Sequence, residues 1–243
     1  MEELIVKESE KYIRDLFEKE IRENLRYHDI IHTEYVAGMA DRIGKNSGLI
    51  KEDLQIVIVA AWFHDSGFVS RSDGHEEESQ NIARKFLSSK EMSEEFIDKV
   101  LICIQATKMP QNPGNNLLAQ VVCDADMAYL SEDFYMGRTT LLRKEWNHES
   151  KTKLSKKTYY QETVELFKNH SYYTPYAKKE YTPGKAKNFK LLHKLRKKKS
   201  NKGTMKAKQL QSDNKKLEKK IRKREIARQG GRIHVSSHCE KPD

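Results

Sequence analysis

The sequence has few cysteines and lacks long apolar runs. Its three cysteines, Cys103, Cys123 and Cys239, are odd in number and form no CxxC pair. Without a signal peptide, this set is typical of the reducing cytoplasm rather than of a disulfide-stabilised secreted protein. No stretch approaches the 18 or so apolar residues that indicate a membrane-spanning helix, so we expect a cytoplasmic protein without a membrane span.

The chain is rich in charge, and the charge is unevenly distributed. Hydrophobic residues make up 37% of the 243 residues and charged residues 34%, which is enough apolar content for one core but not for a second. Residues 178–228 contain 21 Lys and Arg against 4 Asp and Glu, whereas the chain as a whole has a net charge of +10. The body preceding this segment is therefore mildly acidic, and the tail is strongly basic.

Apolar residues recur at helical spacing through most of the body. No alternation of strands and helices and no series of short strands occurs, so we predict an all-α fold. The expected helices span residues 3–26, 32–45, 52–65, 75–88, 94–106 and 117–130, and a more polar helical region follows at 131–170.

The predicted domain covers residues 1–195 and includes an aromatic and proline-containing hinge near 171–184. Residues 196–243 are expected to form a basic tail that is helical or disordered. A run of Lys and Arg is most often a solvated extension, although it can bind nucleic acid or an acidic membrane surface through phosphate charge. The sequence is also compatible with an oligomer.

The stretch at residues 56–67 is the most informative in the chain. Eight apolar residues lead directly into His64-Asp65, and Ser66-Gly67 follow. An apolar run of this length belongs in a core, where a carboxylate is costly unless it is paired or holds a metal. A second His-Asp pair, His28-Asp29, lies in a polar stretch and lacks this context.

Two further residues complete a candidate ligand set with His64 and Asp65. His32 begins the second predicted helix, and Asp126 lies on the apolar segment 117–130. Two imidazoles and two carboxylates from three core elements suit a divalent ion such as Mn, Fe, Mg, Ni or Zn. A metal in such a site lowers the pKa of a bound water, which is the chemistry of phosphoester hydrolysis.

The order His32, His64-Asp65, Asp126 resembles the HD-domain superfamily of predicted metal-dependent phosphohydrolases. Shorter matches to one subgroup occur at Tyr27-His28, at residues 74–79, at residues 106–110 and in Tyr-Thr-Pro-Gly-Lys at 181–185. The resemblance covers roughly residues 1–195. It implies an all-α helical bundle that holds a metal between its helices, with His32, His64, Asp65 and Asp126 as ligands.

The resemblance also suggests roles for neighbouring residues. His75 matches a position that binds a second metal or faces the substrate phosphate in relatives. Ala106-Thr107-Lys108 stand where two-metal relatives often place a further His pair, so one tight metal is favoured, with Lys108 as a phosphate clamp.

Two residues are assigned to support the ligands rather than to bind the metal. His28 is expected to be structural or to support a ligand. Asp124 and Asp126 are two residues apart and so point about 200° apart on a helix; Asp126 fits the family pattern, and Asp124 would orient a ligand.

The leading hypothesis is an enzyme, a metal-dependent phosphohydrolase or phosphodiesterase that acts on a nucleotide or a related small phosphoester. In this scheme Asp65 orients the attacking water and Lys108 stabilises negative charge. The alternative is a catalytically silent nucleotide sensor that signals through its basic tail. A third reading, a nucleic-acid-binding protein led by the tail, predicts binding that falls steeply with salt.

Overall fold

The computed structural model describes residues 2–149, 155–198 and Lys215, and all of these except Lys215 belong to one unit, Met1–Ser200. The described residues contain nine α-helices, two short 3-10 helices and no strand, which confirms the all-α prediction. The elements are α1 (Glu2–Glu20), α2 (Ile30–Asn46), α3 (Lys51–Phe63), η1 (Ser66–Val69), α4 (His75–Ser89), α5 (Glu94–Ala106), α6 (Leu117–Met127), η2 (Ala128–Ser131), α7 (Tyr135–Glu149), α8 (Lys156–Asn169) and α9 (Pro175–Lys198).

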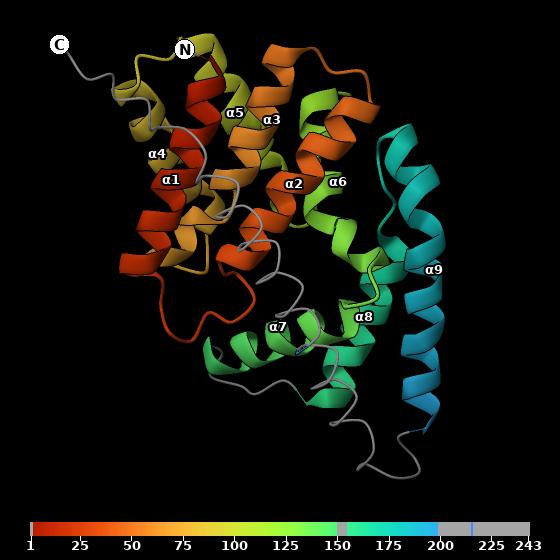
Figure 1. The fold of residues 1–243 in the computed structure, drawn as a ribbon. Coiled ribbons are helices and arrows are strands. Elements are labelled where there is room, and N and C mark those ends of the chain that lie inside the picture. The colour runs from red at the N-terminus through yellow and green to blue at the C-terminus, as the bar shows by residue number, and fades with distance from the viewer. Residues whose placement is uncertain (1, 150–154, 199–214, 216–243) are drawn as a thin grey trace, which may run out of the picture. The chain divides into compact units, whose positions relative to one another are not determined.

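Helix α3 lies at the centre of the bundle (Figure 1). Its side chains are apolar on almost every side, and a helix of this kind belongs in the interior of a protein. Val57, Ala60 and Phe63 are completely buried. The helix packs against α1, α2, α4, α5 and α6, so its C-terminal end delivers His64-Asp65 into the interior.

Helix α1 ends earlier than its sequence pattern predicts. We expected a helix to about residue 26, but α1 stops at Glu20 and residues 21–29 form a loop. The buried Leu25 and Tyr27 belong to this loop. The backbone N–H groups of residues 26–28 bind a carboxylate of α7 rather than the preceding helical turn.

Side-chain caps define several of the other helix starts. The Asp29 carboxylate accepts a hydrogen bond from the backbone N–H of His32 at the start of α2. Ser93 caps α5 as its sequence position predicts, and Asn116 caps α6. Such caps satisfy N–H groups that have no partner within the helix, so they fix where each helix begins.

The segment predicted as a hinge is mostly helical, which corrects that expectation. Helix α9 begins at Pro175 and continues past Pro183 to Lys198, so the boundary predicted at residue 195 falls within it. Asn188 donates to the carbonyl oxygens of Leu130 and Glu132, and a Cβ at Gly184 would lie 2.4 Å from the Ser131 carbonyl oxygen. A close approach to η2 therefore holds this part of α9 against the body.

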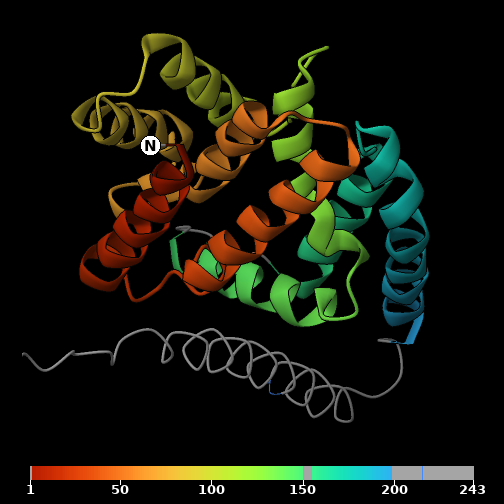
Figure 2. The same ribbon diagram turned by 45° about the horizontal axis from the view of Figure 1, so that its top comes forward.

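The position of helix α7 matters for the site that follows. Helix α7 crosses the bundle beside the loop between α1 and α2, as both views show (Figures 1 and 2).

None of the described helices combines the length and apolar character needed to cross a membrane. The predicted basic tail lies outside the described residues beyond Lys198, apart from Lys215, and its proposed partners stay predictions.

Candidate metal centre

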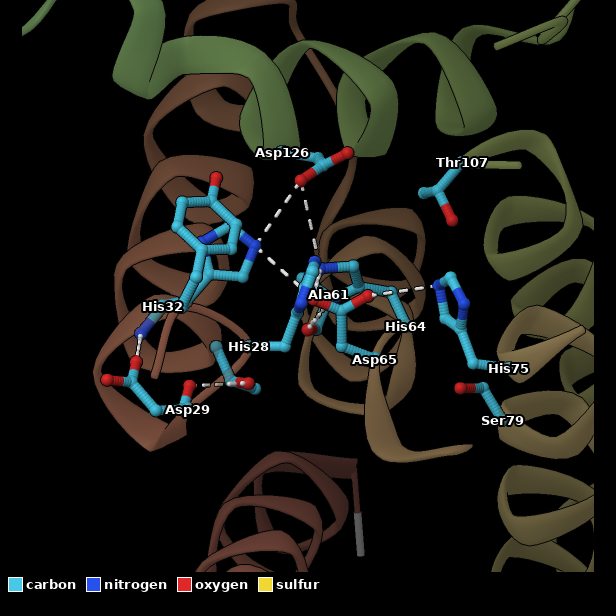
Figure 3. A network of polar contacts seen from close by, with 12 residues as sticks. His28, Asp29, His32, Ala61, His64, Asp65, His75, Ser79, Thr107 and Asp126 are labelled. Carbon is cyan, nitrogen blue, oxygen red and sulfur yellow. Dashed lines mark hydrogen bonds and ion pairs between the residues drawn. The ribbon is translucent and has the colours of Figure 1, made fainter. Parts of the chain in front are cut away.

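Three helices bring the predicted ligands together (Figure 3). His32 lies in the first turn of α2, His64 and Asp65 follow α3, and Asp126 lies in the last turn of α6. One ligand atom each from His32, His64 and Asp126 fall within 4.8 Å of one another, a spacing that a metal ion can bridge. The sequence-based set therefore converges at one point in the fold.

Asp65 is also directed at this point. Its Oδ2 lies 3.0 Å from His64 Nε2 and 3.4 Å from His32 Nε2. Asp126 Oδ1 lies 3.4 Å from His32 Nε2 and 3.8 Å from His64 Nε2. Two imidazole nitrogens and two carboxylate oxygens thus face one small volume.

The orientation of His64 shows that this volume suits a cation. Its Nδ1 lies 2.8 Å from the Ala61 carbonyl oxygen, so Nδ1 carries the proton of the neutral ring, and Nε2 is left to bind either a metal ion or a second proton. His64 Nε2 and Asp65 Oδ2 are both buried and have no hydrogen-bond partner. Two buried lone pairs that face each other repel unless a metal ion or a proton lies between them, so the donor set fits a divalent metal.

Electrostatics lead to the same conclusion. Burial alone would lower the pKa of His64, but the charges of Asp65 and Asp126 outweigh it and raise that pKa to about 9. Burial would raise the pKa of Asp65, yet the neighbouring His64, His28 and His32 hold it well below its ordinary value. The cluster therefore favours an added positive charge.

His75 repeats the arrangement of His64 on the other oxygen of Asp65. Its Nδ1 lies 2.9 Å from the Ser72 carbonyl oxygen, and its Nε2 lies 3.5 Å from Asp65 Oδ1. Thr107 lies on the same side of the cluster as His75, and its hydroxyl donates to the Ile104 carbonyl oxygen (Figure 3). His75 therefore lies at the edge of the cluster, beside the second oxygen of Asp65.

His28 contacts a partner that the sequence did not reveal. Its Nδ1 pairs with Glu145 Oε1 of α7. Its ring stacks on Phe68 with centroids 3.9 Å apart, and Phe68 stacks equally closely on His75. Glu145 lies on a polar helix 117 residues further along the chain, and no local pattern could have indicated its role.

Asp124 lies elsewhere than expected. Its carboxylate accepts hydrogen bonds from the backbone N–H groups of Tyr173 and Thr174, at 2.7 and 2.8 Å, just before α9. The side chain that contacts Asp126 is instead Gln111, whose Nε2 donates to Asp126 Oδ2 at 3.0 Å. Asp124 therefore connects α6 to α9.

Lys108 lies on a groove whose lining includes none of the predicted metal ligands. Lys108 is exposed and lines a groove of about 670 Å³ formed by α5 and the following loop, together with Ile102, Gln105 and Met109. The structure therefore gives no support to Lys108 as a phosphate clamp.

Comparison with known proteins matches the segment that contains the predicted ligands. Residues 29–127 match the family model described as HD domain. This part of the chain is an HD domain. The matched residues contain His32, His64, Asp65 and Asp126, whereas Glu145 of α7 lies beyond them.

A solved structure has the same fold as most of the chain. It is described as the crystal structure of Bacillus subtilis YpgQ in complex with ADP, and it is 19% identical in sequence with a TM-score of 0.58. The alignment covers 82% of this chain and 98% of that one, so the fold shared with YpgQ extends beyond the HD domain itself. No curated protein matches the sequence.

Proposed function

We propose that this HD-domain protein is a metal-dependent phosphohydrolase that cleaves a nucleotide or a related small phosphoester. The observation that carries the proposal is the buried pair His64 Nε2 and Asp65 Oδ2, which lacks hydrogen-bond partners and faces His32 and Asp126. Membership of the HD family, whose members are generally hydrolases, supports the reaction class.

His32, His64, Asp65 and Asp126 would hold one divalent ion. Bound there, the ion would supply an activated water and positive charge that stabilises phosphate oxygens. The hydrogen bond from His64 Nδ1 to Ala61 and the bond from Gln111 to Asp126 fix the orientation of two ligands before any metal binds. Because these two side chains are already held in place, metal binding costs less side-chain conformational entropy.

His28 is suited to donate a proton to the leaving oxygen. Glu145 binds Nδ1, which leaves Nε2 as the available nitrogen. The His28 ring centroid lies 6.1 Å from that of His32 and 6.3 Å from that of His75, at the edge of the ligand cluster. A carboxylate paired with one ring nitrogen fixes the tautomer and the rotation of an imidazole, so Glu145 would hold His28 with Nε2 free to pass a proton to the substrate.

The proposal of a nucleotide as substrate is supported by the likeness to YpgQ. That protein was crystallised with ADP, and its fold covers most of this chain. His75, which is partly exposed beside Asp65, would contact a substrate phosphate or a weaker second metal ion. Manganese is a suitable first metal to test, because the ligand set combines imidazole and carboxylate.

The test compares the parent with Asp65→Ala and with a control, Asp73→Ala. Asp73 is an exposed carboxylate in the loop before α4, so its loss should leave the site unchanged. Each protein is analysed for bound metal after reconstitution with manganese or iron, and is then assayed on a generic phosphodiester, a phosphomonoester and a nucleotide panel.

Stoichiometric metal and turnover in the parent and control, both lost in Asp65→Ala, would support the enzyme. Metal without turnover on any phosphoester would favour the alternative of a silent nucleotide sensor. A parent that takes up no metal would contradict the ligand assignment and the proposed reaction together.

A further inference from the structure

Helix α7 presents two buried, oppositely charged residues on one face. Arg138 and Glu145 are seven residues apart, which is about two helical turns. Arg138 is 5% exposed and Glu145 only 1% exposed. Burying charged groups is costly unless each one is paired and hydrogen-bonded. The partners of both residues lie in one short segment, residues 26–29.

Glu145 collects the backbone N–H groups of this segment. Its Oε2 accepts hydrogen bonds from the N–H groups of Arg26, Tyr27 and His28 at 2.9, 2.8 and 3.3 Å. Burial alone would raise the pKa of Glu145, but His28 and these N–H groups lower it. The carboxylate is therefore ionised and determines the path of the loop that replaces the predicted end of α1.

Arg138 binds the next part of the same segment. Its guanidinium donates to the Tyr27 carbonyl oxygen. It also donates to both carboxylate oxygens of Asp29, at 3.0 Å to Oδ1 and 3.3 Å to Oδ2. The guanidinium carbon also lies 4.8 Å from the centroid of the Tyr27 ring. A planar fork of this kind fixes both the position and the rotation of a carboxylate, which a single ammonium group cannot do.

These contacts reach a metal ligand in one further step. Asp29 Oδ1, held by Arg138, also accepts the backbone N–H of His32 at 2.9 Å and so starts α2. The Tyr27 ring lies against the His32 ring, with centroids 4.8 Å apart. A change at α7 would therefore move the turn that directs His32 Nε2 at Asp65 and Asp126.

We propose that Arg138 and Glu145 are positioning residues which tune the metal affinity of the site from outside the matched HD domain. This inference rests on the proposed function, because it takes His32, His64, Asp65 and Asp126 as the ligands. Residues that orient metal ligands typically change metal affinity about 10- to 100-fold when they are removed.

The experiment measures Mn²⁺ affinity of the full-length chain for Arg138→Met, Arg138→Lys and Glu145→Gln. The matched control is Tyr159→Phe, which removes hydrogen bonds from α8 to Thr139 of α7 and leaves residues 26–29 unchanged. Thermal unfolding in EDTA is recorded for every variant, so that loss of affinity can be separated from loss of stability.

We expect Arg138→Met and Glu145→Gln to bind Mn²⁺ roughly 10-fold more weakly than the parent, and Arg138→Lys to recover part of the loss. Tyr159→Phe should bind as tightly as the parent, whatever its unfolding temperature. If Arg138→Met does not fold, Arg138→Lys and Glu145→Gln decide the question.

Folded variants that bind Mn²⁺ as the parent does would overturn this inference and leave the proposed function intact. Equal weakening in Tyr159→Phe would also overturn it, because the effect would then be one of general stability. A parent that binds no Mn²⁺ would contradict the proposed function itself.

Discussion

Metal binding at this site should release protons near neutral pH. In the metal-free protein the charges of Asp65 and Asp126 raise the pKa of His64 to about 9, so its imidazole is protonated at pH 7. The nitrogen concerned is Nε2, since Nδ1 is committed to the Ala61 carbonyl. A metal that binds Nε2 must displace this proton, because a metal ligand has to be deprotonated.

The magnitude follows from the difference between the pKa and the pH. At pH 7 the protonated form of a group with a pKa of about 9 outnumbers the neutral form by roughly 100 to 1. The apparent affinity for Mn²⁺ should therefore be about 100-fold weaker at pH 7 than above pH 9. Affinity for Mn²⁺ should therefore rise about tenfold for each pH unit between 7 and 9. His32, whose pKa is also raised by Asp126 and Asp65 against the effect of burial, would add to the proton count.

The stability of the metal-free protein should change in the opposite direction. His64 has a higher pKa in the folded state than its ordinary value of 6.5, so it contributes stability that is fully present below about pH 6.5. This contribution, at most about 3 kcal/mol, is lost as the pH rises through 9. The unfolding temperature in EDTA should fall over this range, and bound Mn²⁺ should remove most of the fall.

Calorimetric titration with Mn²⁺ in two buffers of different ionisation enthalpy measures the released protons directly. We expect about one proton or more per metal at pH 7, and fewer as the pH approaches 9. Heats that do not depend on the buffer, together with an affinity that does not change between pH 7 and 9, would refute the assigned orientation of His64.

Three substitutions test other parts of the description. Gly67→Ala would place a Cβ 2.1 Å from the His75 carbonyl oxygen, so we expect a loss of about 1–3 kcal/mol in unfolding free energy, measured by urea denaturation; an unchanged midpoint would contradict the close approach. Asp124→Ala leaves the N–H groups before α9 without an acceptor and should cost about 1–3 kcal/mol, while Mn²⁺ affinity stays the same; a lost metal site would restore Asp124 as a ligand-orienting residue. Lys108→Ala should change kcat/KM less than about twofold, and a loss beyond tenfold would reinstate the phosphate clamp.

Local sequence patterns were sufficient to predict helices where apolar residues recur at helical spacing or a capping residue is present. The apolar run before His64 predicts a buried central helix. Helix α3 is that helix, because apolar side chains on nearly every side of it are removed from water only in the interior. Ser93 predicts the start of α5 because its hydroxyl can cap only the helix that follows it. The same reasoning, with the resemblance of the ligand residues to one family, located the metal cluster.

Contacts between segments far apart in the sequence decided the features that local patterns did not predict. Helical periodicity could not show that α1 stops at Glu20, because the carboxylate that captures the following N–H groups comes from Glu145 on α7. The hinge expected near residues 171–184 is helical from Pro175 onward, where Asn188 and the small Gly184 hold α9 against η2. For the same reason the sequence could not show that Asp124 binds the backbone before α9 and that Gln111 binds Asp126.

The sequence by itself thus determined that the fold is all-α, where the central helix lies, and which residues have the side-chain chemistry that suits a metal. These properties depend on side-chain chemistry and on neighbours within a few residues. Only the tertiary structure decided which polar groups orient those ligands. A buried charge is stable only beside its partner, and that partner can lie more than 100 residues away, as Glu145 does from His28.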